Sequence, residues 1–307
     1  MPIKIPKALP AFDTLSRERV FVMTEDRAES QDIRPLKVGI VNLMPTTIDT
    51  EIQLLRLLGN SPLQVDITFL NMGSHESKNA PPGHLEKFYI NAEEIMCMKI
   101  RLDGLIITGA PVETLDFEEV DYWDELVRVI DYSEKNVFSC LHICWGAQAG
   151  LYRRYKIPKK PLEKKLFGVF PHAVNEQYHN LFRGFDDEFL APQSRHTTCD
   201  RDAIAADSRL TIQSETDETG VFIVTARGGR EVYVTGHLEY DSLTLDREYR
   251  RDTARGLPIE IPKNYYPHNE PSKAPVVRWR AHANLFFDNW LNYVYQETPY
   301  DLGKLSP

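Results

Sequence analysis

Apolar, β-branched runs alternate with segments of helical periodicity in the first half of the chain, and this alternation limits the possible folds more than any other feature. The runs that indicate buried strands lie at 37–43, 63–70, 105–108 and 137–143. The segments with helical spacing lie at 48–58, 122–132 and 145–155, and Gly59 follows the first of them as a C-cap. Strands that alternate with helices build βαβ units with parallel strands. The sequence therefore predicts an α/β fold, a mostly parallel sheet with helices on both faces.

The pattern changes after about residue 205. Three short strands are expected at 210–212, 220–224 and 231–234, and turn residues at 227–230 separate the last two. Residues 285–295 form an apolar, aromatic segment that predicts a helix for the core or for a subunit contact. A homo-oligomer is thus compatible with the sequence.

Domain organisation follows from what lies between these elements. Residues 1–35 are polar and irregular, and residues 257–275, rich in Pro, Asn and Tyr, indicate an extended, ordered C-terminal arm. No segment has the composition of a linker. We therefore expect a single domain over residues 1–307, with an ordered α/β core from about residue 36.

Composition and charge restrict the functional classes. The chain has 307 residues, with 36 Lys or Arg against 45 Asp or Glu, and a formal net charge of −9. This acidic balance argues weakly against a duplex nucleic-acid partner, which requires basic surface. No apolar run approaches the ~20 residues that span a bilayer, and the first six residues lack the apolar stretch of a secretory signal. Four cysteines in so long a chain do not indicate a disulfide framework, so we expect a cytoplasmic protein that engages no membrane.

Cys144 lies where a predicted strand meets a predicted helix, in the segment His142-Ile143-Cys144-Trp145-Gly146-Ala147-Gln148. A nucleophile elbow has this geometry, because a sharp turn exposes the side chain at the end of the strand. The N-terminus of the following helix favours the thiolate over the thiol. The backbone N–H of Trp145 is one expected oxyanion donor, and that of Ala110, in the loop at 109–111, is the second.

Other roles for these cysteines remain open at this stage. Cysteine is commonly a small buried hydrophobic residue, and this is the expected state of Cys140 and Cys199. Cys140, His142 and Cys144 also alternate along one strand and could bind zinc together. A structural zinc site needs a fourth ligand and usually draws on loops, so we predict no metal site.

A second element strengthens the catalytic interpretation. The strand at 231–234 leads into Gly236-His237-Leu238-Glu239. His237 and Glu239 are two residues apart and share a face in extended chain. A carboxylate that accepts the imidazole N–H fixes the tautomer and stabilises the imidazolium. Together with the Cys144 elbow, this pattern predicts a Cys144–His237–Glu239 triad.

The combination of Cys-x-Gly-x-Gln and Gly-His-x-Glu resembles the class I glutamine amidotransferase fold. His142 stands where amidotransferases usually carry Gly, and Leu238 where they usually carry Pro. The chain as a whole is similar to another family on that fold, the homoserine O-acyltransferases of methionine biosynthesis. The tracts that carry this resemblance run nearly end to end: Val20–Thr24, Asn42–Pro45, Asn60–Gln64, Thr108–Pro111, Gly184–Asp187, Ser194–His196, Gly236–Tyr240, Asn289–Tyr293 and Thr298–Leu302.

The resemblance implies roles that spacing alone would not reveal. It makes Cys144 the acyl-accepting nucleophile, His237 the general base and Glu239 its partner. It also implies that Lys165, Ser194 and Arg251 bind substrate and that Glu113 sorts acetyl from succinyl donors. Without it, Lys165 and Arg251 would be taken for surface charges, Ser194 for a loop hydroxyl and Glu113 for an exposed loop glutamate.

The function that the resemblance implies is homoserine O-acetyl transfer, of the acetyl-CoA-using type. The acetyl group would pass from acetyl-CoA to a Cys144 thioester and then to the hydroxyl of L-homoserine, with no cofactor. A Glu at position 113 would repel the terminal carboxylate of a succinyl group, and Arg251 would grip the homoserine carboxylate. The alternatives are homoserine O-succinyl transfer, a glutaminase-type amidotransferase on the same fold, and a non-catalytic thiol sensor or chaperone.

Overall fold

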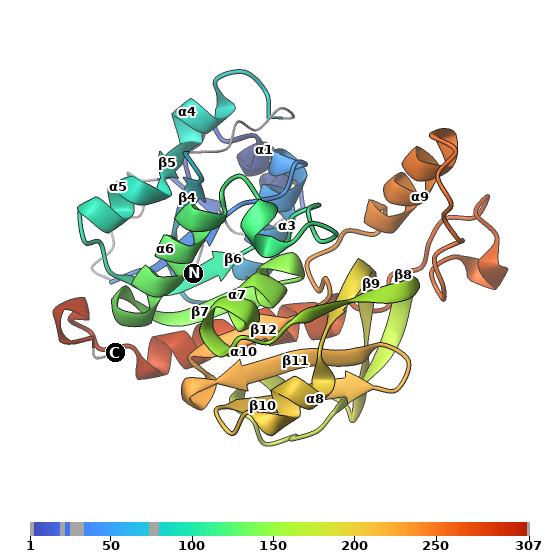
Figure 1. Cartoon of the computed structure of the whole chain (residues 1–307). Helices are drawn as coiled ribbons and strands as arrows, with labels where there is room; N and C mark the ends of the chain where they lie inside the picture. The colour runs from blue at the N-terminus through green and yellow to red at the C-terminus, as the bar shows by residue number, and fades with distance from the viewer. Residues whose placement is uncertain (1–2, 19–21, 25–33, 74–79, 306–307) are drawn as a thin grey trace.

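The computed structural model describes residues 3–18, 22–24, 34–73 and 80–305. In this part of the chain, one 12-stranded sheet runs in the order β2-β1-β4-β3-β6-β7-β12-β11-β10-β8-β9, and β5 pairs with β4 (Figure 1). The strands are β1 (Ile3–Lys4), β2 (Val22–Met23), β3 (Leu36–Val41), β4 (Val65–Asn71), β5 (Tyr89–Asn91), β6 (Leu102–Ile107), β7 (Val137–Ile143), β8 (Lys159–Val174), β9 (Glu188–Cys199), β10 (Leu210–Thr216), β11 (Gly220–Ala226) and β12 (Glu231–Val234).

The sheet has a parallel half and an antiparallel half that meet at β12. From β2 across to β12 every neighbouring pair is parallel. Beyond β12 the pairs are antiparallel. The predicted mostly parallel sheet is confirmed. Since β3, β6, β7 and β12 are parallel neighbours, their carboxyl ends meet at one edge, which is where such sheets place their functional loops.

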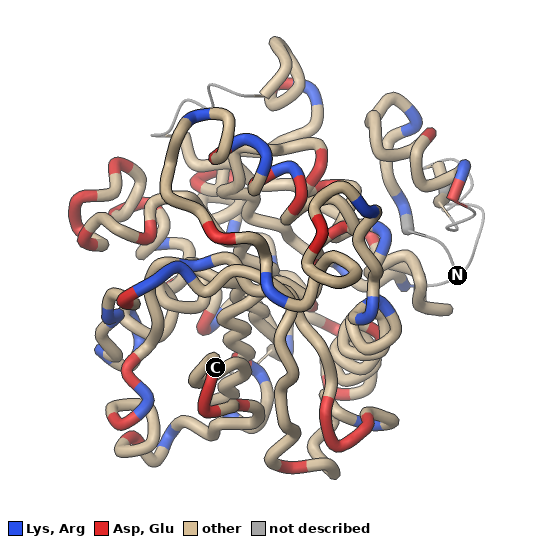
Figure 2. The backbone as a smooth tube through the Cα atoms, turned by 90° about the vertical axis from the view of Figure 1, so that its right-hand side faces the viewer, with Lys and Arg blue, Asp and Glu red and all other residues tan. Residues whose placement is uncertain are grey.

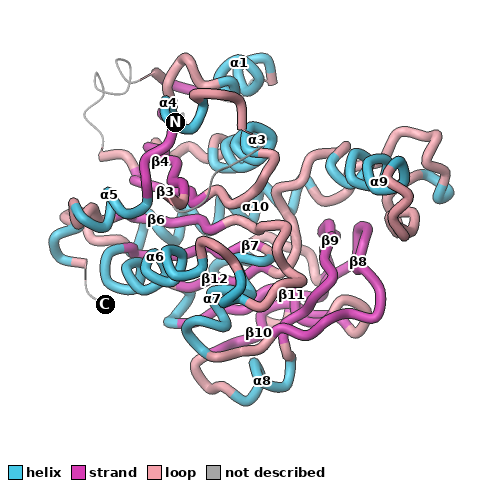
Figure 3. Tube along the Cα trace, turned by 45° about the horizontal axis from the view of Figure 1, so that its top comes forward, coloured by secondary structure: helices cyan, strands magenta, loops and turns pink. Residues whose placement is uncertain are grey.

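Helices cover both faces of the sheet, as predicted (Figure 3). Their bounds are α1 (Pro10–Arg17), α3 (Thr47–Leu58), α4 (His84–Phe88), α5 (Ala92–Cys97), α6 (Trp123–Asn136), α7 (Trp145–Tyr155), α8 (Arg201–Ala206), α9 (Thr244–Ala254) and α10 (Arg280–Glu297). One core layer packs α1, α3 and α10 on the sheet face that carries Ile106 and Leu141. The other packs α5 and α6 on the face that carries Leu105 and Ile107. Within the described ranges, no helix is both long enough and apolar enough to span a bilayer.

A long antiparallel ribbon extends the sheet beyond its layers. It is formed by β8 and β9. In Figure 1, α9 and the segment that follows it lie above and to the right of the bend in this ribbon, where the pairing shifts register between Pro161 and Leu166. Residues 257–275, predicted as an extended arm, are largely irregular and pack on β8. Lys263 forms an isolated bridge with Gly168, and Tyr265 and Tyr266 are buried. Lys and Arg lie beside Asp and Glu along α9 (Figure 2), so this part of the surface carries no single sign of charge.

The amino-terminal elements and the ribbon differ from the sequence-based expectation. Regular structure begins before residue 36, because β1 joins the sheet and α1 buries Leu15 against the core. The ribbon was not predicted at all, since charged side chains and two prolines interrupt the apolar pattern of β8. Its outer residues stay exposed, so the strand needs no continuous apolar face.

Candidate active site

Cys144 forms the turn between β7 and α7, with φ 51° and ψ −116°. A non-glycine residue in this region is strained, and such strain persists only where the surroundings enforce it. Here the Cys144 N–H donates to the Val234 carbonyl at 2.7 Å, which ties the elbow to the end of β12. A Cβ at Gly146 would come within 2.6 Å of the Thr108 carbonyl oxygen and 2.7 Å of that of Ile107, so only glycine lets α7 approach β6.

The loop after β6 borders Cys144, the predicted nucleophile. A Cβ at Gly109 would lie 3.1 Å from the Cys144 Cβ and 3.6 Å from the His237 Cε1. The next residue, Ala110, is buried, and Trp145 begins α7 directly after Cys144. The two predicted oxyanion donors therefore belong to segments that flank the sulfur.

His237 and Glu239 follow β12 at the same edge of the sheet. The His237 Nδ1 lies 2.7 Å from the Glu239 Oε1, and the His237 N–H donates to the Pro192 carbonyl at 3.0 Å. Burial alone would lower the pKa of His237. The negative charges of Cys144 and Glu239, and the hydrogen bonds to both, outweigh burial and raise this pKa well above its ordinary value. The surroundings therefore favour the imidazolium form of His237, beside Cys144 and Glu239.

The other buried cysteines lack such a partner. Burial raises the pKa of Cys140 to about 11 and that of Cys199 to about 12, so both remain neutral thiols at neutral pH. His142 is buried and stacks on Tyr233, with ring centroids 4.8 Å apart. Among the described residues, no group of three or more His, Cys, Asp or Glu side chains is placed to hold a metal ion.

The three residues assigned to substrate binding converge on a carboxylate that the sequence analysis missed. Lys165 Nζ of β8 lies 2.5 Å from the Glu248 Oε1, and the Ser194 hydroxyl of β9 lies 2.9 Å from both Glu248 oxygens. Arg251 Nη2 is 3.8 Å from the same carboxylate, and its Nε donates to Asp252 at 2.6 Å. We call Lys165, Ser194, Glu248 and Arg251 the polar cluster. Glu248 and Arg251 are three positions apart on α9, and this spacing was the available signal.

Tyr240 joins the triad to the polar cluster, and it too was missed as a site residue. Its ring stacks on His237, with centroids 3.9 Å apart and planes 11° from parallel. Burial and nearby negative charge raise the pKa of Tyr240 well above its ordinary value, and the charged groups are Glu248, Cys144, Glu239 and Glu113. The electrostatic environment of the Tyr240 hydroxyl therefore includes charges of the polar cluster, of the predicted triad and of Glu113, the residue predicted to select the donor.

Glu113 is half-buried and held in place. Its Oε2 accepts from the Thr197 N–H at 3.2 Å and from the Thr197 hydroxyl at 3.1 Å. The Glu113 carbonyl accepts from Lys159 at 2.8 Å. Glu113 therefore differs from the exposed loop glutamate that composition alone would suggest.

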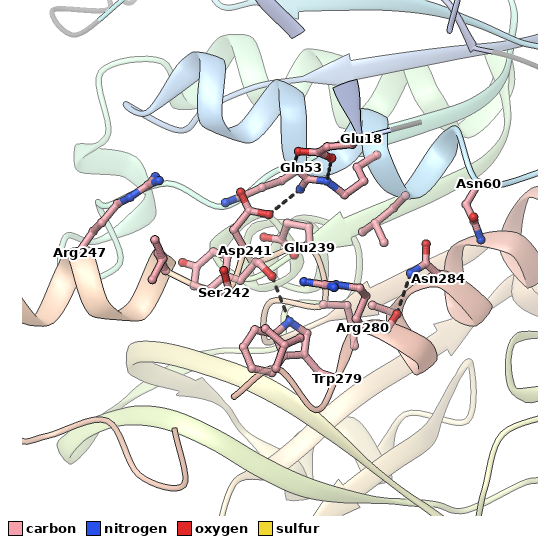
Figure 4. A pocket seen from close by; sticks show the side chains of 17 residues that line it. Glu18, Gln53, Asn60, Glu239, Asp241, Ser242, Arg247, Trp279, Arg280 and Asn284 are labelled. Carbon is pink, nitrogen blue, oxygen red and sulfur yellow. Dashed lines mark hydrogen bonds and ion pairs between the residues drawn. The ribbon is translucent and has the colours of Figure 1, made fainter. Parts of the chain in front are cut away.

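A cavity of about 580 Å³ borders the triad carboxylate Glu239 (Figure 4). Arg56 of α3 is paired with Glu18 and with Asp241, each at 2.5 Å. Trp279 donates its indole N–H to the Tyr240 carbonyl at 3.0 Å. These contacts tie the chain after His237 to α3 and to the start of α10, and so hold Glu239 behind the imidazole.

Comparison with known proteins identifies the family and the fold. The family described as homoserine O-succinyltransferase matches residues 2–300. A homoserine O-acetyltransferase of Acetivibrio thermocellus is 57% identical over 307 residues, which covers 100% of both chains. One of Clostridium novyi is 58% identical, covering 98% of this chain and 99% of the relative. A glutamine amidotransferase from Thermotoga maritima shares the fold, with a TM-score of 0.59, 13% identity, and coverage of 86% of this chain and 100% of its own.

The resemblance stated from the sequence is thus confirmed, and the amidotransferase-like fold with it. The structural likeness is at low identity and concerns the fold alone. The family assignment rests on sequence identities of 57% and 58% to relatives over nearly the full length of the chain. The chain belongs to the homoserine O-succinyltransferase family.

Proposed function

We propose that this protein is a homoserine O-acetyltransferase, which moves the acetyl group of acetyl-CoA through a Cys144 thioester to the hydroxyl of L-homoserine. The observation that supports this proposal is that Cys144, His237 and Glu239 lie beside the polar cluster, which contains both positively and negatively charged side chains. A nucleophile paired with an imidazolium suits acyl transfer. A cluster with two cations and one carboxylate suits a small zwitterion.

In the first half-reaction, the Cys144 thiolate attacks the thioester carbonyl of acetyl-CoA. A carbon–sulfur bond to Cys144 forms, and the bond to coenzyme A breaks as the tetrahedral intermediate collapses. The N–H groups of Trp145 and Ala110 would stabilise the oxyanion, and one such donor typically contributes about 3 kcal/mol. His237 gives its proton to the departing coenzyme A thiolate.

In the second half-reaction, neutral His237 accepts the proton of the homoserine hydroxyl as that oxygen attacks the acetyl-enzyme. The new ester bond forms, the bond to Cys144 breaks, and the thiolate returns beside the imidazolium. Glu239 stabilises each imidazolium state through the 2.7 Å contact with His237. Two successive substrates on one covalent intermediate imply ping-pong kinetics.

The polar cluster offers groups that could bind both charges of the acceptor, L-homoserine. We assign the homoserine carboxylate to Arg251 and Lys165, since a guanidinium pairs with a carboxylate bidentately. We assign its ammonium to Glu248, whose carboxylate contacts Lys165 and Ser194. The substrate ammonium would then share this carboxylate with Lys165.

The choice of acetyl over succinyl donor rests on Glu113. The family description names succinyl transfer, whereas the full-length relatives are named acetyltransferases. A succinyl group ends in a carboxylate, and a fixed carboxylate at position 113 would repel it. Two such charges ~4 Å apart repel by about 4 kcal/mol at an effective dielectric near 20. The uncharged acetyl group avoids this penalty.

We propose that the protein acts in the cytoplasm. All four cysteines are free thiols in the structure, as expected in a reducing compartment. The substrates that we propose are small molecules, acetyl-CoA and L-homoserine.

Intact-mass measurement tests the proposal. The protein is mixed with acetyl-CoA or succinyl-CoA separately, and L-homoserine is then added. We expect an acetyl adduct on Cys144 that homoserine discharges, with a much slower reaction from succinyl-CoA. A faster reaction from succinyl-CoA would reverse the donor assignment. Ammonia release from glutamine without any acyl adduct would replace the proposal with the glutaminase activity.

A further inference from the structure

Thr197 occupies a position on β9 where three separate elements contact one residue. From the loop after β6, the Glu113 Oε2 accepts from both its N–H and its hydroxyl. From α7, Gln148 Nε2 donates to the Thr197 carbonyl at 3.3 Å. From β9 itself, Arg195 Nη1 donates to the same carbonyl at 2.9 Å. Thr197 is therefore a junction between the loop of Glu113 and the helix of the nucleophile.

This junction is buried and held by several hydrogen bonds. Thr197 is 5% exposed, Gln148 is 1% and Arg195 is 0%. Arg195 is further fixed by donating to the Thr219 carbonyl at 2.5 Å and to the Gln193 amide oxygen at 3.1 Å. Opposite Thr197 in the ribbon stands Pro161, which has no N–H to donate. The Thr197 N–H and carbonyl are therefore bonded by the side chains of Glu113, Gln148 and Arg195, where a regular strand pair would use backbone groups.

The Thr197 hydroxyl has one proton and two acceptors within reach. The Glu113 Oε2 lies 3.1 Å away and the Gln148 Oε1 lies 3.0 Å away. A hydrogen bond to a charged acceptor is the stronger of the two, so the proton goes to Glu113. Gln148 keeps its own contact with Thr197 through the carbonyl.

We infer that Thr197 is a positioning residue for acyl-donor selection, which holds the Glu113 carboxylate where a succinyl terminus would have to lie. The inference rests on the proposed function of Glu113. Glu113 lies in a half-exposed loop, and a glutamate side chain without a tether rotates into water. Coulomb repulsion falls with distance and with access of solvent, so a rotated carboxylate would discriminate little. The two hydrogen bonds from Thr197 prevent this rotation.

The test is the rate of Cys144 acylation by acetyl-CoA relative to succinyl-CoA, measured by rapid quench and intact mass. Thr197→Val removes the hydroxyl donor and keeps the volume and the β-branched shape. We expect the acetyl-to-succinyl ratio to fall about tenfold, mainly because succinyl transfer rises. The KM for L-homoserine should stay within about twofold, because the polar cluster is untouched.

Thr197→Ser separates positioning from general stability. Serine restores the hydroxyl but deletes a buried methyl group, so it should unfold at lower temperature than the valine variant. A positioning role predicts that serine keeps the donor ratio and valine loses it. A purely structural role predicts the opposite order. Thr198→Val, at the next position on β9, is the matched control and should leave the ratio unchanged.

Glu113→Ala distinguishes failure of the inference from failure of the proposed function. If Glu113→Ala lowers the ratio and Thr197→Val does not, the positioning role of Thr197 is refuted while the role of Glu113 stands. If neither changes the ratio, Glu113 does not select the donor and both ideas fall. If the inference is correct, adding Thr197→Val to Glu113→Ala changes the ratio no further, because the carboxylate that Thr197 holds is gone.

Discussion

Glu248→Gln offers the sharpest test of how the acceptor is recognised. The change removes one negative charge and keeps the size of the side chain and an oxygen for the Ser194 hydroxyl. Glu248 and Lys165 are 18% and 14% exposed, so their site is neither fully buried nor fully in water. At ~3 Å, opposite charges attract by about 5.5 kcal/mol at a dielectric near 20 and by about 1.4 kcal/mol in water. We expect loss of the ammonium contact to cost about 2 kcal/mol, or about 30-fold in affinity.

The substitution also frees Lys165, which would then hold the substrate carboxylate more strongly. A comparison of two acceptors cancels this effect. L-Homoserine and 4-hydroxybutyrate share the hydroxyl and the carboxylate, and only homoserine carries an ammonium. We expect Glu248→Gln to lower the kcat/KM ratio of homoserine to 4-hydroxybutyrate about 30-fold. Coenzyme A release in the first half-reaction should be unchanged.

Glu260→Gln is the matched control for this experiment. Glu260 pairs with Lys164 at 2.9 Å, and the two side chains are 77% and 79% exposed. The Glu260–Lys164 pair is a solvent-exposed counterpart of the Glu248–Lys165 pair, because Lys164 and Lys165 are neighbours on β8. Its loss should leave both acceptors unaffected, since exposed ion pairs contribute little. An unchanged acceptor ratio in Glu248→Gln, or an equal loss in acylation by acetyl-CoA, would refute the ammonium assignment.

Three further outcomes are expected. Cys144→Ser should abolish the acyl adduct in intact-mass spectra, and an adduct that persists on another cysteine would show a misassigned nucleophile. Cys144→Ala should lower the pKa of His237, followed by NMR, because burial then acts with less opposing negative charge. Since this pKa is raised in the folded protein, its stabilising effect is fully present below the unfolded value of about 6.5 and is lost as pH rises through the folded value. Urea unfolding across that range should therefore show the stability advantage of the wild type over Cys144→Ala shrinking as pH rises. Gly146→Ala should destabilise the fold by about 2–4 kcal/mol in the same assay, because its methyl group would meet the Thr108 and Ile107 carbonyl oxygens.

The strands and helices of the parallel half could be predicted because their signals are local. The strand at 137–143 and the helix at 145–155 were expected at the residues where they are found. The strand is a continuous buried run, and the helix buries Trp145 to Leu151, so the local hydrophobic pattern together with segment length identifies both. The ribbon of β8 and β9 could not be found this way. It is only partly buried, and its stability comes from pairing between residues far apart in sequence.

The residues of the candidate site differ in the same way, since some have a local sequence signal and others do not. Cys144, His237 and Glu239 stand at strand ends beside glycines, and such local patterns carry a chemical meaning of their own. The roles of Lys165, Ser194 and Arg251 came from the family resemblance, since nothing local distinguishes them from surface residues. Glu248 was missed because its partners come from β8 and β9, and only the folded ribbon brings them to α9.

The role proposed for Glu113 would explain how one family could include both acetyl and succinyl transfer on one scaffold. Among the described residues, the Glu113 carboxylate hydrogen-bonds to Thr197 and to neither His237 nor Glu239. A substitution at position 113 therefore removes a charge without breaking the 2.7 Å contact that orients the imidazole. Thr197 would keep its contacts with Gln148 and Arg195, so the ribbon would remain attached to the nucleophile helix. If Glu113 selects the donor as we propose, donor choice changes at one loop residue while the triad and the polar cluster stay as they are, because different elements of the fold carry the three parts.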